Sequence, residues 1–433
     1  MNPENTIGPP KRNPWVWVPS LYFAEGIPYV VVMTVSVIMF KRMNVSNTDI
    51  ALYTSWLYLP WVIKPAWSPL IDMFRTKRFW VVAMQVVIAF SLASVALTVP
   101  SSQFFRYTLA VFWLMAFGSA THDIAADGFY MLGLDQHGQA AFVGVRSTFY
   151  RVATITGQGL LVMVAGLLEQ STGGDVSLAW SVTFVILSGI FFCAFAYHRF
   201  LLPYPQTDKP VRTIGARGMF GDFFATFVLF FKKKNIVSTM LFLLFYRFAE
   251  AQLVKLVSPF LLDAREKGGL GLGTSEVGFV YGTVGIIALT LGGLLGGYLA
   301  SRIGLKASLW IMVGAIHLPD LAFVYLSHVQ PTDFFLINAA VAVEQFGYGF
   351  GFTAYMLYMI TVSEGEHKTA HFAICTGFMA LGMMLPGMFS GALQEYLGYK
   401  NFFVWVMLST VPGFIVAALV KVDPEFGKRK ATT

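Results

Sequence analysis

Apolar residues occur in runs of about 20 along almost the whole chain, and short polar segments separate these runs. A helix needs about 20 apolar residues to cross the roughly 30 Å hydrocarbon core of a bilayer. The pattern therefore predicts an all-α membrane protein with twelve transmembrane helices. Their expected ranges are 15–40, 49–68, 79–99, 107–133, 143–168, 178–200, 236–263, 275–299, 307–327, 333–362, 369–394 and 400–420.

One long polar stretch, 201–235, divides the spans into two sets of six. We therefore expect an N-terminal six-helix bundle (1–200), a cytoplasmic linker (201–235) and a C-terminal six-helix bundle (236–433). Phenylalanines of the linker share one helical stripe and three lysines follow them, a pattern that predicts an interfacial helix on the membrane surface. These residues are Phe220, Phe223, Phe224, Phe227, Phe230, Phe231, Lys232, Lys233 and Lys234.

The two sets of spans repeat each other weakly. Residues 23–26 (Phe-Ala-Glu-Gly) match 248–251 (Phe-Ala-Glu-Ala), and 130–132 match 355–357 (Tyr-Met-Leu) at the same offset. Repeats of this kind predict two six-helix pseudo-repeats that are related by an axis normal to the membrane. The substrate site is then expected between them, near the midplane of the membrane.

Composition and charge agree with a bilayer location. Of the 433 residues, 56% are hydrophobic and only 12% are charged, which is too apolar for an ordinary soluble domain. Lysines and arginines gather in the segments that a cytoplasmic N-terminus would place inside the cell. This topology explains the net charge of +7, so the charge does not indicate a nucleic-acid partner. Both termini are expected to be cytoplasmic. Cys193 and Cys375 fall inside spans and indicate neither a disulfide nor a metal site, and we expect no cofactor.

Asp123 and Asp127 lie one helical turn apart in an apolar span, so they share one face. A carboxylate at mid-bilayer costs about 2.5–3.5 kcal/mol, and the pair is therefore expected to line a polar cavity or a proton path. Two such carboxylates can share one proton; the alternative is that both permanently bridge basic or polar groups.

Glu25 precedes Gly26-Ile27-Pro28, a combination that can kink a membrane helix, and Glu250 is its repeat partner. Both are candidates for proton coupling, together with Asp123 and Asp127. A structural salt bridge with Arg247 or Arg151 is an equally supported role for the two glutamates.

Basic and aromatic side chains within the spans are candidates for binding substrate. A planar guanidinium suits a two-point grip on a carboxylate, and a tyrosine face suits a sugar ring, although packing is the commoner role of a buried tyrosine. Lys64 can alternatively snorkel to the interface, and His122 can alternatively be a packed, hydrogen-bonded residue. The candidates are Arg151, Arg247, Lys64, His122, Tyr22, Tyr150 and Tyr246.

With this plan, the motif Gly-x-Leu-x-x-Arg-x-Gly-x-Lys at 297–306 resembles the major facilitator superfamily. Within it, 64–72 (Lys-Pro-Ala-Trp-Ser-Pro-Leu-Ile-Asp) and 122–129 (His-Asp-Ile-Ala-Ala-Asp-Gly-Phe) resemble AmpG-type muropeptide permeases and, more distantly, acetyl-coenzyme A transporters. Tyr150-Arg151 and 344–351 resemble the same permeases, and the resemblance covers nearly all of 15–420.

This resemblance adds Glu344 and Gln345 to the substrate-site candidates. It also implies that Asp72, Arg75 and Arg302 act as a gate in the loops after spans two and eight; the alternative is that they only fix topology. Two departures alter the expected contacts. His122 stands where these permeases usually have glutamine, and Arg247 stands where they have lysine.

The paired carboxylates and the resemblance together predict a proton-coupled symporter of the bacterial inner membrane that works by alternating access, and the two-half plan predicts a functional monomer. Its expected substrate is a cell-wall-derived anhydromuropeptide or amino sugar. Acetyl-coenzyme A or another acidic metabolite is the alternative substrate, and a non-transporting receptor or scaffold is the alternative class. Paired aspartates also occur in intramembrane proteases, but protease aspartates face each other from two helices, whereas these two stack on one, so we do not expect an enzyme.

Overall fold

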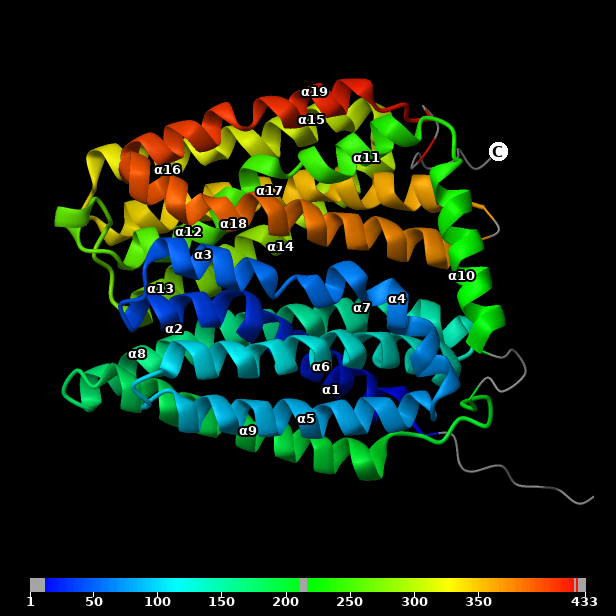
Figure 1. Cartoon of the computed structure of the whole chain (residues 1–433). Coiled ribbons are helices and arrows are strands. Elements are labelled where there is room, and N and C mark those ends of the chain that lie inside the picture. The colour runs from blue at the N-terminus through cyan, green and yellow to red at the C-terminus, as the bar shows by residue number, and fades with distance from the viewer. Residues whose placement is uncertain (1–11, 211–215, 366, 424–425, 427–433) are drawn as a thin grey trace, which may run out of the picture.

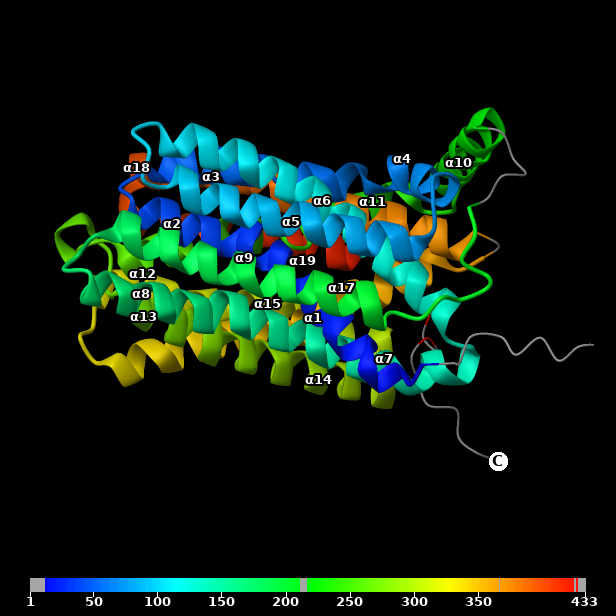
Figure 2. The same cartoon turned by 90° about the horizontal axis from the view of Figure 1, so that it is seen from below.

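The computed structural model describes residues 12–210, 216–365, 367–423 and 426. Its helices run side by side along one direction, and α10 (Ala216–Phe231) stands across their ends at the right of Figure 1. We call this end of the molecule the linker end and the opposite end the far end. The helices keep the same side-by-side arrangement when the molecule is seen from below (Figure 2).

The N half comprises the described elements before α10. It forms six membrane-length segments, several of which are built from more than one helix. They are α1 (Val18–Val30), preceded by η1 (Pro14–Val16) and followed by η2 (Val31–Val35) and α2 (Ser36–Arg42); α3 (Asn47–Trp56) with α4 (Leu59–Met73); α5 (Lys77–Thr98); α6 (Phe104–Gly133); α7 (Gln136–Thr154) with η3 (Ile155–Leu161) and α8 (Val162–Ser171); and α9 (Val176–Leu201).

The C half comprises the described elements after α10 and also forms six segments. They are α11 (Ile236–Phe245) with α12 (Phe248–Leu262), followed by η4 (Arg265–Lys267); α13 (Thr274–Val277) with η5 (Gly278–Gly285) and α14 (Ile286–Ile303); α15 (Leu305–His317) with η6 (Leu318–Asp320) and α16 (Leu321–Val329); α17 (Phe334–Ser363); the first arm of α18 (Lys368–Leu408); and its second arm with α19 (Val411–Leu419). The two arms of α18 meet at Gly398, whose φ of 71° bends the chain back.

The predicted all-helical fold with twelve spans is confirmed within the described residues. Eight continuous stretches of this part of the chain are by themselves long and apolar enough to cross a membrane. One of them, Ala370–Leu419, contains both arms of α18 and therefore accounts for two spans. Among the remaining segments, α3–α4 and α11–α12 are each interrupted near their middle.

One of these interruptions lies beside a charged candidate residue. The seventh segment stops being helical at Tyr246 and Arg247, and Arg247 has φ −110° and ψ 22°. This break places Glu250 in the first turn of α12. The structure thus has a broken helix at Glu250, whereas α1 runs unbroken through Glu25 and Pro28 and changes to a wider π-type turn only at Val31.

Polar contacts between the two halves gather at the far end and in the middle of the molecule. At the far end, Lys41 forms an ion pair with Asp263 at 2.7 Å. Beside it, the Asn47 side-chain amide donates to Gln394 at 2.6 Å and to the Tyr399 hydroxyl at 2.9 Å. We call this set of contacts the far-end seal.

Glycines bring backbones of the two halves into direct contact at the seal. A Cβ atom on Gly391 of α18 would lie 2.0 Å from the carbonyl oxygen of Asn47. Nearer the middle, a Cβ on Gly282 of η5 would lie 2.1 Å from the carbonyl oxygen of Gln158 on η3. Because neither backbone can yield to a side chain, only glycine permits this closeness.

Glu169, near the end of α8, connects several segments at the far end. Its carboxylate accepts hydrogen bonds from the Arg42 guanidinium at 2.9 Å, from the Trp180 indole at 3.0 Å and from the Thr274 hydroxyl at 2.8 Å. Thr274 belongs to the C half, so this buried carboxylate also ties the halves together.

We expect Glu169→Ala to lower the free energy of unfolding by about 3 kcal/mol, because a partly buried guanidinium and two buried donors lose their acceptor. Denaturant or thermal unfolding of the purified protein in detergent measures this loss. The matched control is Glu395→Ala, which removes an exposed carboxylate bonded to Thr48 and is expected to cost less than about 1 kcal/mol. Equal losses in the two variants would contradict the prediction.

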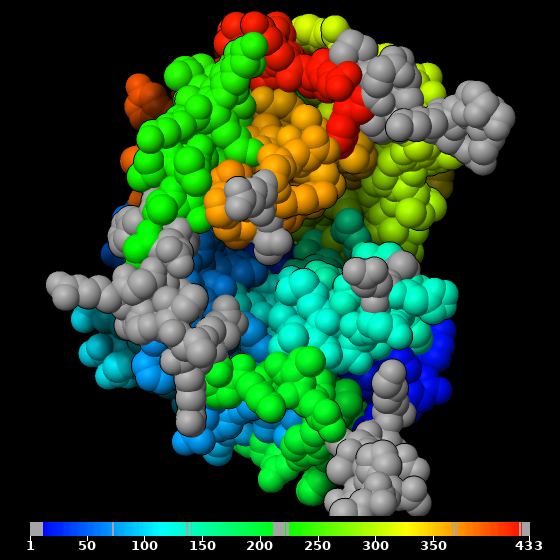
Figure 3. Space-filling model, turned by 90° about the vertical axis from the view of Figure 1, so that its right-hand side faces the viewer, coloured from blue at the N-terminus to red at the C-terminus, as the bar shows by residue number. Residues whose placement is uncertain are grey.

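The linker helix α10 crosses the linker end and its last turn packs on the C half (Figures 1 and 3). Phe230 is fully buried, with its ring 5.6 Å from that of His371, and Phe231 lies 6.1 Å from Phe378. Lys233 donates to backbone carbonyls at the end of α17. The side chains of Phe220, Phe223 and Phe224 lie outside the described residues. The predicted interfacial helix is thus anchored to the C half by its basic end, and its membrane contact stays a prediction.

Candidate functional site

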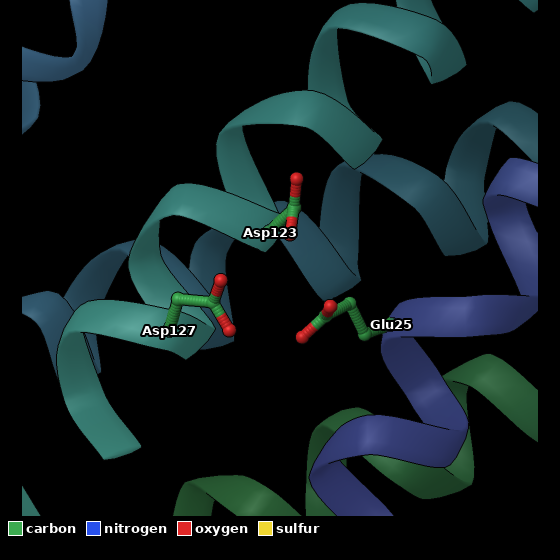
Figure 4. Close-up of side chains that lie close together, drawn as sticks. All are labelled: Glu25, Asp123 and Asp127. Carbon is green, nitrogen blue, oxygen red and sulfur yellow. The ribbon is translucent and has the colours of Figure 1, made fainter. Parts of the chain in front are cut away.

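Three carboxylates meet inside the N half, and we call them the N-half triad: Glu25 of α1 and Asp123 and Asp127 of α6. One oxygen from each lies within 4.8 Å of the others. Figure 4 shows the Asp127 and Glu25 carboxylates pointing toward each other across the gap between the two helices. The helical spacing predicted the shared face of the aspartates, and the packing of α1 on α6 adds Glu25.

Two cations and a hydroxyl hold the aspartates. Lys64 of α4 forms an ion pair with Asp123. Arg146 of α7 forms an ion pair with Asp127 at 2.8 Å, and the Tyr22 hydroxyl donates to the same carboxylate oxygen at 3.1 Å. The Arg146 guanidinium also lies over the Tyr22 ring, 4.6 Å from its centroid. The structure therefore brings the predicted residues Tyr22 and Lys64 to the triad.

The N-half triad is accessible to solvent although its helices lie inside the bundle. The Asp127 side chain is 36% exposed and that of Asp123 is 22% exposed, whereas Glu25 is buried. Figure 3, which views the linker end, shows a recess between the cyan part of the N half and the orange part of the C half. Solvent thus reaches the two aspartates. The recess, which we call the linker-end passage, lies at the linker end, and the far-end seal lies at the opposite end of the molecule.

Close approach of α1 and α7 places the triad beside the fifth segment. A Cβ on Gly26, next to Glu25, would lie 2.7 Å from the Cβ of Ala153 and 3.2 Å from the carbonyl oxygen of Tyr150. Tyr150 and Arg151 are both partly buried. A glycine at position 26 therefore lets Tyr150 approach the acidic site, whereas Arg151, the next residue on the helix, lies on a different face of α7.

Arg247 lies at the break between α11 and α12, among aromatic rings of the C half. Its guanidinium donates to the Tyr348 hydroxyl and lies 5.1 Å from the Tyr348 ring centroid and 4.6 Å from that of Phe352. Neighbouring Tyr246 is fully buried and donates its hydroxyl to the carbonyl of Gly351 at 2.8 Å. The geometry therefore favours packing for Tyr246, and substrate contact by Arg247 stays a prediction.

His122 lies on the side of α6 away from the aspartates. It is fully buried, and its Nε2 lies 3.0 Å from the Gln85 amide, whose oxygen lies 3.0 Å from His198 Nδ1. This chain joins α5, α6 and α9 inside the N half. The packed alternative considered for His122 is the one that this arrangement favours.

Glu250 and Glu344 lie together with Asp320 in a second acidic cluster, which we call the C-half triad. All three are buried, and the Gln345 amide donates to Glu344 at 3.0 Å. The predicted pair Glu344 and Gln345 thus lies in this cluster rather than beside the N-half triad.

The predicted gating residues make local contacts in this structure. Arg302 is exposed and donates to the Tyr298 hydroxyl on its own helix at 3.1 Å. The Arg75 guanidinium lies 5.6 Å from the Phe79 ring centroid. The side chain of Asp72 lies outside the described residues. Arg75 and Arg302 thus contact neighbours close in sequence, and a gating role stays a prediction.

Sequence reasoning missed Arg146 as a site residue. It lies inside the predicted span 143–168, where a charge is as costly as at Arg151, and this cost is the signal that marks it. Its partner Asp127 lies on the preceding segment, and only the packing of the helices shows that the two side chains meet.

Comparison with known proteins identifies the family. A sequence model described as the Major Facilitator Superfamily matches residues 20–364. The chain belongs to this superfamily. Its solved structures agree in fold: the D-xylose-proton symporter matches with a TM-score of 0.72 at 13% identity, over 96% of this chain and 98% of that one. The nucleoside transporter NupG matches with a TM-score of 0.70 at 16% identity, over 94% and 98% of the two chains.

More specific relatives confirm the resemblance to AmpG-type permeases. The chain is 25% identical over 410 residues to the putative transporter AmpG 4 of Rickettsia conorii, covering 92% of this chain and 94% of that one. It is 26% identical over 416 residues to the anhydromuropeptide permease of Escherichia coli (strain K12), covering 94% and 79%. The chain is thus a multi-pass membrane transporter for a small molecule, in a superfamily of secondary transporters and not of enzymes.

Proposed function

We propose that this transporter is a proton-coupled symporter that imports a cell-wall-derived anhydromuropeptide or a related amino sugar by alternating access. The substrate class comes from the relatives named AmpG transporter and anhydromuropeptide permease, which are similar over more than nine-tenths of this chain. The proposal that the coupling ion is a proton rests on the N-half triad.

The observation that carries the coupling is the charge balance of this triad. It has three carboxylates and two paired cations, Lys64 and Arg146, and one buried Glu25 oxygen has no hydrogen-bond partner among the residues that the structure describes. A third ionised carboxylate would be uncompensated, so one proton shared within the cluster neutralises it. Because Asp127 is reached by solvent, that proton can leave through the linker-end passage.

Arg247 and Arg151 are proposed to bind the acidic part of the substrate. Arg247 lies against Tyr348 and Phe352, so a carboxylate can take its guanidinium while the sugar ring packs on the aromatic faces. Arg151 projects from α7 of the N half, and together the two arginines would contact the substrate from both halves.

The conformation supports an alternating-access cycle. With both termini in the cytoplasm, the linker end is the cytoplasmic end, and this structure is open inward and closed outward. We propose that residues 1–200 and 236–433 rock against each other while 201–235 ties them together. In this scheme the chain works as a monomer in a bacterial inner membrane, and protonation of the N-half triad from outside precedes inward release.

Uptake by proteoliposomes tests the proposal. With an inward pH gradient, the wild type is expected to accumulate radiolabelled anhydromuropeptide above its external concentration, and Asp127→Asn is expected to lose accumulation at least about 100-fold while still exchanging substrate without a gradient. Lys267→Gln, an exposed change outside the site, is the control. Accumulation of coenzyme A esters alone would contradict the substrate, and full gradient-driven accumulation by Asp127→Asn would contradict the coupling.

A further inference from the structure

The C-half triad differs from the N-half triad in burial and in charge. Glu250, Asp320 and Glu344 are 0%, 1% and 1% exposed, and one oxygen from each lies within 4.8 Å of the others. They come from three different segments, α12, η6 and α17. Among the described residues, no lysine or arginine forms an ion pair with these three carboxylates. In the N-half triad, by contrast, Lys64 and Arg146 form ion pairs with the aspartates.

Most carboxylate oxygens of this cluster have no hydrogen-bond partner in the described part of the chain. Both oxygens of Glu250, both of Asp320 and one of Glu344 are buried and unpartnered. Gln345 donates to the remaining Glu344 oxygen. Buried polar atoms in folded proteins are nearly always hydrogen-bonded. Several unpartnered acceptor oxygens in one buried cluster therefore indicate that a positively charged ligand is missing.

The charges of the surroundings point the same way. Arg247 is the positive side chain that acts on Glu250, while the charges acting on Asp320 and Glu344 are those of the other members of the cluster. One guanidinium leaves the three carboxylates with excess negative charge in a dry core. A bound cation would reduce this excess and supply a partner for one oxygen of each carboxylate.

The spacing of the oxygens admits a calcium-sized cation. Three oxygens no more than 4.8 Å apart leave a centre at most about 2.8 Å from each. This limit includes the roughly 2.3–2.6 Å distances of calcium-sized ions, which also accept irregular oxygen cages. Mg²⁺ requires about 2.0–2.1 Å and keeps several waters, which this buried cluster does not accommodate.

We propose that Glu250, Asp320 and Glu344 form a binding site for one hard metal cation of Na⁺ or Ca²⁺ size in the C half. This site is separate from the solvent-accessible N-half triad, and it does not depend on the proposed proton coupling or substrate. A bound ion would hold η6 and α17 to the first turn of α12, beside Arg247.

Thermal unfolding of the purified protein tests the site. The protein is stripped with a chelator and melted in choline chloride, NaCl or CaCl₂ at equal ionic strength. A saturable rise in Tm of at least about 3 °C with Na⁺ or Ca²⁺ is expected, and the arm that gives it identifies the ion. Glu344→Gln and Asp320→Asn are each expected to weaken the apparent affinity at least about tenfold, whereas Glu395→Gln, on the exposed face of α18, leaves it unchanged.

Direct binding keeps the proposal testable if these variants do not fold. Radioactive Na⁺ or Ca²⁺ is then expected to bind the wild type at one ion per chain. Equal Tm values in all three salts together with no bound ion would overturn the proposal. So would a cation-dependent shift that Asp127→Asn abolishes and Glu344→Gln retains, because that result places the ion in the N-half triad. Neither measurement involves transport, so failure here is distinct from failure of the proposed symport.

Discussion

Replacing Lys64 with methionine is expected to lower gradient-driven uptake at least about 100-fold. Lys64 pairs with Asp123, and removing one partner of a partly buried ion pair leaves the other charge uncompensated. The triad then loses the charge balance on which the proposed sharing of one proton depends. Initial rates of uptake in proteoliposomes with an imposed pH gradient measure the loss.

A double-mutant cycle separates this effect from unfolding. Lys64→Met/Asp123→Asn removes both charges, so it is expected to regain the melting temperature lost in Lys64→Met and yet to remain inactive in gradient-driven uptake. Lys267→Met, an exposed lysine at the far end, is the matched control. Wild-type uptake by Lys64→Met would show that the pair only fixes the helices.

Adding one methyl group at Gly391 is expected to move the transporter out of the conformation described here. A Cβ at this position would meet the carbonyl oxygen of Asn47 at 2.0 Å and the Cβ of Ala51 at 2.8 Å, so the far-end seal cannot close. Overpacking of this kind costs about 1–3 kcal/mol, which shifts the equilibrium about 5- to 150-fold toward the state open at the far end. Uptake is expected to fall by a similar factor.

Cysteine labelling measures that shift. Ser55 is fully buried between the halves, and a thiol introduced there by Ser55→Cys in a Cys193→Ser/Cys375→Ala background reports opening of the far end. We expect fast modification by a membrane-impermeant maleimide in Gly391→Ala and slow modification otherwise. Gly189→Ala is the control, because a Cβ at Gly189 meets nothing within 4 Å. Equal labelling rates would contradict a closed seal.

The twelve spans were predictable because their apolar runs have membrane length, and a bilayer imposes helical structure on any such run. The interruptions inside the runs were not. The break at Tyr246 and Arg247 lies in a segment whose composition is apolar on both sides, and a helix can stop there only because the surrounding helices bond or pack against the freed residues. The hydrophobic pattern of the sequence does not show these contacts, so it cannot predict the break.

The site was predictable in its residue types and not in its pairings. Asp123 and Asp127 share a face by helical geometry, and the cost of a charge in the membrane marked Lys64 as well. The ion pair between Lys64 and Asp123 joins residues 59 positions apart, and it depends on how α4 packs against α6. The convergence of Glu250, Asp320 and Glu344 depends in the same way on three separate segments, so the sequence displayed each acid and gave no sign that they meet.

The contact of bare backbones at Gly282 and Gly391 has a consequence for speed. Interlocking side chains must change rotamers before two surfaces part, whereas peptide groups can separate as rigid plates and exchange their neighbours for water in one movement. Backbones in such close contact fit together in few alignments, so we expect the halves to return to the same register when they close. Glycine at these two positions is therefore expected to favour both fast separation and a reproducible closed geometry.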